Sequence, residues 1–511
     1  MAAAAEPRPT LAYFPIILGL SLAFTITVVD PLILGLNMPQ ISRALHVPPE
    51  VVGFLGGVAT LVVAAAVLAV GNLGDAYGLK RLLTLGLVGS AVVNVLSALS
   101  PGYVFLLVMR LLDGVALALI LGVALALLKV SVPEERRPAA IGLFMAIEMV
   151  LCGVTPAVGG WVVDAFGWRW LFLLVPLIAL GALALTARHV TEPPALRRRE
   201  VDALGVSLVG LALLSLVHGF AEAQNGITRP QAWLPLAASA IAGVLFVLHE
   251  RRTPAPALQL SLFRSGAFTV AALASLTLNF IAAGFSVVLG QFGSVILSLS
   301  QRAIGLLYLP GTLLSAAAIV LSGRLIGKYT PRPVLITSLL LLTASSLLMA
   351  ATAEPTMALW ILVLATWLAN LGSLVASASA AEVILSHAPP GKAGVVAAVQ
   401  PTFAMTGYAL GPAVYLLLLN LFFQRQWLND AAERGLSVTE AEEAVDATRS
   451  AMAHSPGSAG YDPNLLRHSG LDLGLDFTDG LRLTMLVVSL LPLSLAVAAY
   501  LLMPRRTPTT P

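Results

Sequence analysis

Long runs of apolar residues, separated by short polar stretches, follow one another along almost the whole chain. A helix needs about 20 mostly apolar residues to cross the roughly 30 Å of hydrocarbon in a bilayer. By this measure the sequence predicts fourteen membrane-spanning helices and hence an all-α integral membrane protein. They are expected at 12–36, 51–73, 82–99, 103–128, 138–162, 169–187, 203–221, 232–248, 268–290, 303–325, 333–351, 357–379, 394–422 and 482–503.

The composition agrees with a chain whose main solvent is lipid. Of the 511 residues, 58% are hydrophobic and 11% are charged, whereas a soluble domain carries about 25% charged residues. The formal net charge of +3 gives no reason to expect a nucleic-acid partner. Cys152 is the only cysteine, so the sequence offers no CxxC metal motif, and we expect no cofactor or metal. We expect the protein to act as a monomer.

The positions of lysine and arginine predict the orientation of the chain. Positively charged residues are concentrated in cytoplasmic loops, and most of the 29 lysines and arginines fall there if the N-terminus is cytoplasmic. An even number of spans then places both termini in the cytoplasm. Alanine and leucine are abundant and arginine outnumbers lysine, which is typical of a GC-rich bacterial genome. We therefore expect a multi-pass protein of the cytoplasmic (inner) membrane of the cell.

One polar stretch, 423–481, is too long to be a simple connection and is expected on the outer side. It holds ten acidic residues against four arginines. A capping box at Ser437 and Glu440, or two residues later, would open a helix that ends near His454. Two interpretations stay open. The stretch is either a solvated linker domain or an acidic funnel that concentrates cationic ligands at the outer mouth.

A glycine-rich loop between the second and third expected spans carries a motif. It reads Gly71-Asn-Leu-Gly-Asp75-Ala-Tyr-Gly78-Leu-Lys80-Arg81. The glycines let two helices and a tight loop approach closely, and Asp75 can meet a helix N-terminus or a cation. Lys80 and Arg81 would hold the loop in the cytoplasm. The motif resembles the loop signature of the major facilitator superfamily, and a degraded second copy ends at Arg332, as two related six-helix bundles would require.

Three further motifs resemble those of the fourteen-span drug:proton antiporters of that superfamily. They are Asp30-Pro31 in the first span, Arg110-Leu-Leu-Asp113-Gly114 in the fourth, where the family usually has Arg-x-x-Gln-Gly, and Gly153-Val-Thr-Pro156-Ala-Val-Gly159-Gly160 in the fifth. The outer segment before the last span is similar to that of the quaternary-ammonium exporters in this group. The resemblance implies the major facilitator fold, with six-helix bundles at 1–190 and 266–511 and a two-helix linker at 191–265.

Four ionisable residues, Asp30, Arg110, Asp113 and Glu148, lie inside apolar spans. Each charge there costs at least about 2.5 kcal/mol on the insertion scale unless it is paired or hydrated. We expect Asp30 to exchange a proton; the alternative is a fixed ion-pair partner. Arg110 and Asp113 share a helical face, so structural pairing and proton coupling both stay open. Glu148 is a second proton or cation site if it faces the cavity, or part of a salt-bridge network if it faces Arg110.

The small residues of the fifth-span motif predict a close helix seam. Gly153, Gly159 and Gly160 permit tight packing, and Pro156 bends the helix. The resemblance adds that this seam governs whether the cavity leaks protons.

Polar and aromatic residues in the second half predict a cavity for an amphipathic or weakly cationic molecule. These candidates are Asn279, Gln291, Trp367, Asn370, Gln400, Phe403 and Tyr408. Span 394–422 carries no acidic residue, although quaternary-ammonium exporters tend to have acids in this helix. That absence argues against a dicationic substrate.

The sequence therefore predicts proton-coupled export of hydrophobic or amphipathic small molecules, such as drugs, dyes or antiseptics, by alternating access. The alternative is a dedicated exporter of one natural product or lipid-like molecule. A membrane-embedded enzyme would need a GxSxG or HExxH motif, or clustered His, Asp and Glu at membrane depth, and the sequence has none. A channel would need a repeated filter-like segment, and no such segment repeats in the sequence. The expected partners are the substrate, protons and the lipid bilayer.

Overall fold

The structure is a computed structural model that describes most of the chain. The described residues are 13–133, 136–192, 202–224, 226, 228–253, 256, 258–297, 299, 330–387, 396, 398–433 and 473–504. Within these ranges the regular structure is helical, and no strand occurs. Backbone polar groups in a bilayer have no water to bond, so an apolar chain of this kind satisfies them inside helices.

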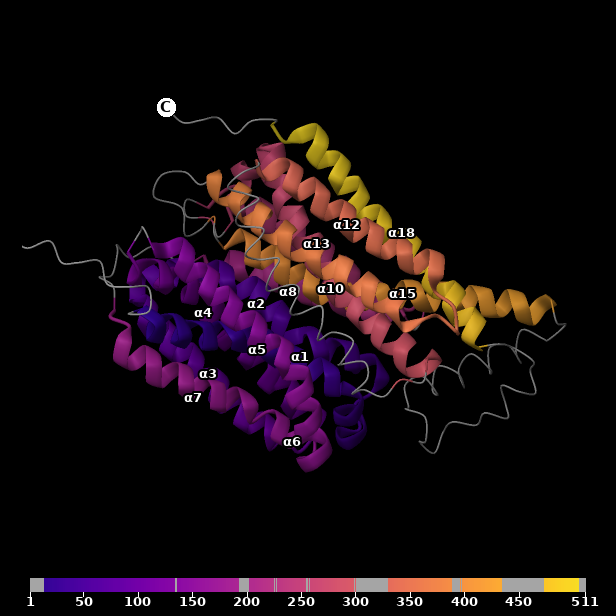
Figure 1. The fold of residues 1–511 in the computed structure, drawn as a ribbon, viewed down its shortest axis with the longest axis horizontal. Helices are drawn as coiled ribbons and strands as arrows, with labels where there is room; N and C mark the ends of the chain where they lie inside the picture. The colour runs from indigo at the N-terminus through magenta and orange to yellow at the C-terminus, as the bar shows by residue number, and fades with distance from the viewer. Residues whose placement is uncertain are drawn as a thin grey trace, which may run out of the picture.

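The N-terminal half is a bundle of long helices that surround a common core (Figure 1). Its helices are α1 (Phe14–Leu45), α2 (Pro49–Tyr77), α3 (Leu79–Ala98), α4 (Tyr103–Ser131), α5 (Arg137–Phe166), the short α6 (Trp168–Leu171) and α7 (Leu174–His189). Helix α4 packs against α1, α2 and α3, and α1 also packs against α5 and α7. This arrangement brings α1, α3 and α4 together around the centre of the bundle.

The C-terminal half forms a second bundle beside the first. Its helices are α10 (Gly266–Gln291), α12 (Pro331–Thr352), α13 (Leu359–Ser386), α15 (Val399–Glu433) and α18 (Leu473–Leu502). Helices α10 and α15 have the most extensive contact. Gly407 and Gly411 make this contact possible, because a Cβ atom at either position would meet the backbone of Leu276 or Phe280. Small residues of this kind let membrane helices approach closely.

The two linker helices, α8 (Ala203–Ala223) and α9 (Pro230–Glu250), pack against each other. Helix α8 also contacts α2 of the first half and α15 of the second. Leu61, Val217 and Ala409, one from each of these three helices, share one apolar cluster. In Figure 1 the α8 label lies at the boundary of the two bundles, in agreement with these contacts. The linker helix is therefore part of the contact between the halves.

Most of the expected spans fall on observed helices. Eleven helical stretches of the described chain are long and apolar enough to cross a membrane. Helices α2 and α5 cover two further expected spans, 51–73 and 138–162. The expected span at 303–325, and with it most of the second loop motif, lies outside the described residues. The structure thus supports an all-helical, multi-pass protein and leaves the count of fourteen helices untested.

The predicted boundaries of the acidic segment 423–481 are wrong at both ends. Helix α15 continues to Glu433, and α18 begins at Leu473. Trp427 and Phe477 are buried in the core of the C-terminal half. The average polarity of the segment concealed these aromatic residues, which extend the apolar faces of both helices. The helix expected to end near His454 lies outside the described residues.

Candidate functional site

A buried ion pair joins α1 to α4 at the centre of the N-terminal bundle. Arg110 Nη1 donates hydrogen bonds to both carboxylate oxygens of Asp30, at 2.9 and 3.0 Å. The Arg110 side chain is 0% exposed and that of Asp30 is 2% exposed. The Phe172 ring lies 5.1 Å from the guanidinium carbon. Asp30, the charged residue inside the first expected span, is thus paired with Arg110 on another helix.

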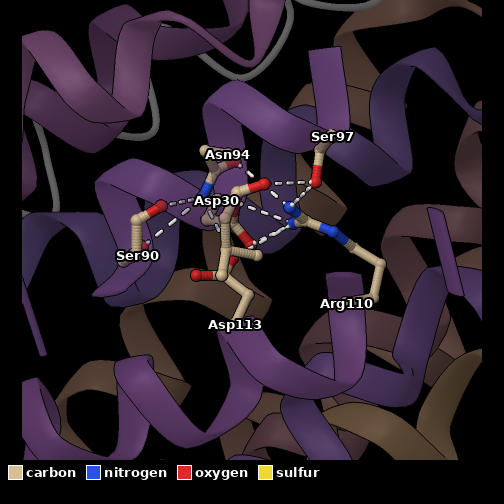
Figure 2. A network of polar contacts seen from close by, with 7 residues as sticks. Asp30, Ser90, Asn94, Ser97, Arg110 and Asp113 are labelled. Carbon is tan, nitrogen blue, oxygen red and sulfur yellow. Dashed lines mark hydrogen bonds and ion pairs between the residues drawn. The ribbon is translucent and has the colours of Figure 1, made fainter. Parts of the chain in front are cut away.

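Helix α3 completes the site with neutral polar groups (Figure 2). Arg110 Nη2 donates to Asn94 Oδ1 at 3.2 Å and to Ser97 Oγ at 2.9 Å. Asn94 Nδ2 in turn donates to Asp113 Oδ2 at 3.1 Å and to the carbonyl oxygen of Ser90 at 3.0 Å. Sequence reasoning missed these α3 residues. Their spacing of three and four positions, on one face of an otherwise apolar helix, is the signal that could have found them.

Asp113 lies next to Arg110, as the spacing of three residues predicted. Its Oδ2 is 3.2 Å from Arg110 Nη1, and its side chain is fully buried. Among the described residues, no donor bonds to its other oxygen, Oδ1. The carboxyl groups of Asp113 and Asp30 both lie close to the same nitrogen of Arg110, Nη1, at 3.2 and 2.9 Å. The structure therefore brings Asp30, Arg110 and Asp113 into one network.

Glu148 lies on α5, apart from this network. It is 9% exposed and accepts a hydrogen bond from the Cys152 thiol at 3.5 Å. Within the described part of the chain it makes no ion pair. Met405 of α15 packs against the core of the N-terminal half, as do Met145 and Ile147 of α5. Glu148 is thus near the place where α5 approaches the second bundle.

The loop between α2 and α3 is held by an acidic residue that the sequence reasoning did not single out. Glu192 accepts hydrogen bonds from the backbone N–H groups of Lys80 and Arg81, at 3.0 Å each. The Lys80 ammonium donates to the Val190 carbonyl oxygen at 2.6 Å. A carboxylate is stabilised at a helix N-terminus because the unpaired N–H groups carry partial positive charge. The loop is thereby tied to the segment that follows α7.

Gly78 makes the tie to Glu192 possible. Its φ of 98° lies in a region that side chains rarely adopt, and a Cβ atom there would meet the Glu192 carboxylate. Gly71 and Asp75 belong to the last turns of α2; the side chain of Asp75 is outside the described part. In this structure the loop motif therefore forms a tight turn between α2 and α3, and this turn leaves space for the Glu192 carboxylate.

The fifth-span motif lies within a continuous helix. Gly153, Pro156, Gly159 and Gly160 all belong to α5, which packs against α1. Space for a Cβ atom at Gly159 is limited by the side chain of Leu171. The motif thus lies on the helix that also carries Glu148.

The candidate cavity residues of the second half are distributed over α10, α13 and α15. Gln400 donates to Ser377 Oγ at 3.2 Å, which links α15 to α13, and the Phe403 ring packs on Phe263 with centroids 5.8 Å apart. Asn279 bonds within α10. The Trp367 indole nitrogen is buried and has no hydrogen-bond partner in the part of the chain that the structure describes. The remaining candidates, Asn370, Gln291 and Tyr408, are half-buried on α13, at the end of α10 and on α15. The structure does not bring these residues into contact with the Asp30–Arg110–Asp113 network.

Comparison with known proteins decides the family. The family model described as Major Facilitator Superfamily matches residues 15–412. The chain belongs to the Major Facilitator Superfamily. Its resemblance to this superfamily, first seen in the loop motif, is confirmed.

Several similar members of the superfamily have names that refer to resistance or efflux. The tetracenomycin C resistance and export protein of Streptomyces glaucescens is 28% identical over 80% of this chain and 76% of its own length. The multidrug efflux pump LfrA of Mycolicibacterium smegmatis is 26% identical, over 81% and 82% of the two chains. The methylenomycin A resistance protein of Streptomyces coelicolor is 28% identical, over 79% and 85%.

Solved structures of other transporters have the same fold. A bacterial homologue of the human lysosomal transporter Spinster, in an inward-facing and unoccupied conformation, has a TM-score of 0.64 with 16% identity. The match covers 99% of this chain and 100% of that one. The human organic anion transporter MFSD10 (TETRAN) has a TM-score of 0.60, also with 16% identity, over 97% and 100% of the two chains. At such identities the likeness concerns the fold.

Proposed function

We propose that this protein exports hydrophobic or amphipathic small molecules, such as drugs, dyes or antiseptics, in exchange for protons. The names of the relatives support efflux as the activity. The two-bundle fold supports alternating access, in which one bundle rocks against the other. The protein catalyses no covalent reaction in this proposal. Its partners are the substrate, protons and lipid.

The observation that carries the proposal is the buried network of Asp30, Arg110 and Asp113. Ionisable residues inside membrane spans are costly and are kept where a proton or ion pathway needs them. When Asp30 gains a proton, its attraction to Arg110 weakens, and Arg110 keeps Asp113 as its ionised partner. The contact between α1 and α4 then changes with the protonation state.

This change can reach the contact between the bundles through α2. Gly114, the residue after Asp113, lies against Ala59 and Val62 of α2 so closely that a Cβ atom would collide there. Helix α2 in turn packs against α8 and α15. A shift of α4 therefore displaces the helix that contacts the second half. We assign the coupling of protonation to rocking to this chain of packed helices.

Glu148 is the third carboxyl group in the proposal. It has no ion-pair partner in the described chain, and its neighbour Ile147 packs against the same core as Met405 of α15. A carboxylate at that place can balance the positive charge of a cationic substrate, or take up a proton when the substrate leaves. The tight residues from Gly153 to Gly160 on the same helix keep this region closed to proton leak.

The membrane topology that we propose has fourteen spans, with a bundle at 1–190, a two-helix linker at 191–265 and a second bundle at 266–511. The protein resides in the cytoplasmic membrane as a monomer with both termini inside. The positions of lysine and arginine support this orientation.

A dedicated exporter of one natural product is the second candidate function. Two of the relatives are named for resistance to a single antibiotic each, tetracenomycin C and methylenomycin A. The absence of acidic residues from 394–422 also fits a narrow range of substrates better than a range of dications.

Growth of an efflux-deficient bacterium that expresses the protein, on a panel of unrelated toxic compounds, tests the function. We expect tolerance to several unrelated amphipathic compounds, lost in the Asp30→Asn variant at equal expression. Tolerance confined to one chemical class would favour the dedicated exporter. Unchanged sensitivity to every compound would contradict export of such molecules.

A further inference from the structure

Two buried hydrogen-bond donors on α13 have no acceptor. The Trp367 indole N–H and the Ser373 hydroxyl group are closed off from solvent, and neither has a hydrogen-bond partner among the described residues. Other buried hydroxyl groups of the same helix do have one. Thr366 and Ser379, for example, each donate to the carbonyl oxygen one turn back. A buried donor without an acceptor is costly and rare in native proteins, so these two groups call for an explanation.

Both donors belong to one polar face of α13. Trp367, Asn370, Ser373 and Ser377 follow one another at intervals of three, three and four residues, which places them along one broad side of the helix. Ser377 Oγ accepts a hydrogen bond from Gln400 of α15 at 3.2 Å, so this side is turned toward α15. Helix α13 packs extensively against α12 and α10 but has little contact with α15. The polar face therefore borders the loosely joined boundary of α13 and α15.

The groups on this face are donors and carry no charge. An indole N–H only donates, and a hydroxyl or a side-chain amide both donates and accepts. The sequence has no charged residue in the middle of α10, α12, α13 or α15, so the helices around this face supply no counter-charge for a cation. The Trp367 ring adds an aromatic surface, against which other rings stack favourably. Such a face suits an uncharged aromatic group that carries oxygen acceptors.

We propose that the α13 face formed by Trp367, Asn370 and Ser373 binds the uncharged, carbonyl- or ether-bearing aromatic part of the exported molecule. This choice of substrate class rests on the proposed function. Trp367 and Ser373 are six residues apart, about 9 Å along the helix axis, a length that a planar fused-ring molecule spans. The ligand supplies the acceptors that the protein lacks. Because both donors are closed off here, the ligand reaches them when the two bundles move apart.

A site of this kind discriminates against molecules that lack the acceptor, since its buried donors then stay unpaired. The pair 9,10-anthraquinone and anthracene tests this, because both have three fused rings and only the quinone has carbonyl oxygens. Dissociation constants are measured by equilibrium dialysis of the radiolabelled compounds against the full-length protein in lipid nanodiscs, with binding to empty nanodiscs subtracted. Each hydrogen bond should contribute a preference of about fivefold, so we expect the parent to prefer the quinone roughly 25-fold.

Two variants remove the donors one at a time. Trp367→Phe and Ser373→Ala should each lower the preference about fivefold, and the double variant should bind both compounds alike. Loss of ring area in Trp367→Phe weakens both compounds, so the ratio isolates the N–H group. Trp360→Phe and Ser386→Ala are matched controls on the same helix. Their side chains are exposed, and the preference should stay that of the parent.

Thermal unfolding of the ligand-free protein gives a readout that a structural role would move in the opposite direction. Ser373→Ala removes a hydroxyl group without a partner, so the melting temperature should stay the same or rise. Ser345→Ala is the comparison: its hydroxyl donates to the Ala365 carbonyl oxygen at 2.7 Å, and its loss should lower the melting temperature.

Three results would each overturn the proposal. They are no measurable binding of anthraquinone, equal affinity of the parent for both compounds, and a preference that survives in the double variant. A fall in melting temperature for Ser373→Ala as large as that for Ser345→Ala would also contradict it, because the hydroxyl group would then have a partner. A protein that shows the expected preference but gives tolerance to no compound in the growth test would refute export and leave the binding site standing.

Discussion

Replacement of Arg110 by glutamine removes the one positive charge of the buried network. Glutamine keeps part of the aliphatic stem and a neutral amide in place of the guanidinium that donates to Asn94 and Ser97. Asp30 and Asp113 then face each other without a cation, and one more carboxyl group must become neutral than in the native protein. An aspartate in water has a pKa of about 3.9, so neutralising it at pH 7 costs about 4.2 kcal/mol.

The same arithmetic gives a pH dependence. At pH 5 the cost of neutralising that carboxyl group falls to about 1.5 kcal/mol. The folded variant binds one more proton at this site than the folded parent, while both unfolded chains release theirs. The free energy of unfolding of the variant therefore falls below that of the parent by about 1.4 kcal/mol more for each unit that the pH rises between 5 and 7. The value at pH 7 agrees with the 3–5 kcal/mol that is typical when one partner of a buried ion pair is removed.

Unfolding of the purified protein in detergent at pH 5, 6 and 7 is the assay. We expect Arg110→Gln to be less stable at every pH and most clearly at pH 7. The triple variant Asp30→Asn, Arg110→Gln, Asp113→Asn should regain most of the loss and show no deficit that grows with pH. Arg482→Gln is the control, because Arg482 is 34% exposed and pairs with Glu354 and Asp479 near the surface. Such pairs contribute about 0–1 kcal/mol.

Equal stability of Arg110→Gln and the parent at all three pH values would refute this reasoning. So would a triple variant as unstable as the single one, since the loss would then come from packing and not from charge.

Three further substitutions test other parts of the account. Gly78→Ala places a side chain at a φ of 98° against the Glu192 carboxylate. We expect the free energy of unfolding to fall by roughly 1–2 kcal/mol from the backbone alone, measured by thermal unfolding. An unchanged melting temperature would show that the turn is not constrained. Glu148→Gln should express normally but change the pH profile or the range of compounds exported in an efflux assay; no effect on either would reduce Glu148 to a packing role. Gly411→Leu should separate α10 from α15 and lower the melting temperature, whereas Gly243→Leu, where the structure shows open space, should not.

The helices were predictable because the bilayer imposes a simple rule. Each long apolar run, such as 103–128, has to become a helix that satisfies its own backbone, and α4 covers that range. The ionisable residues inside those runs were equally visible. Their partners were not, because the hydrogen bonds of Arg110 to Asp30 and Asn94 join three different helices, α1, α3 and α4.

The place of α8 could not be read from the sequence for a related reason. In a membrane protein the lipid-facing and the protein-facing sides of a helix are both apolar. The apolar residues of α8 therefore gave no sign that Val217 would pack with α2 and α15. Glu192 was hidden differently: it follows the last helix of the first half as an ordinary loop acid, and only the turn at Gly78 reveals its partner.

Proteoliposomes with an imposed pH gradient test the central claim most directly. They should contain either the parent protein or Asp30→Asn at equal density, with an amphipathic dye as the substrate. The account predicts that the parent moves the dye against its concentration gradient while protons flow the other way, that collapse of the pH gradient stops this movement, and that Asp30→Asn shows none of it. Uphill transport that continues after the gradient collapses, or that Asp30→Asn performs as well as the parent, would contradict it.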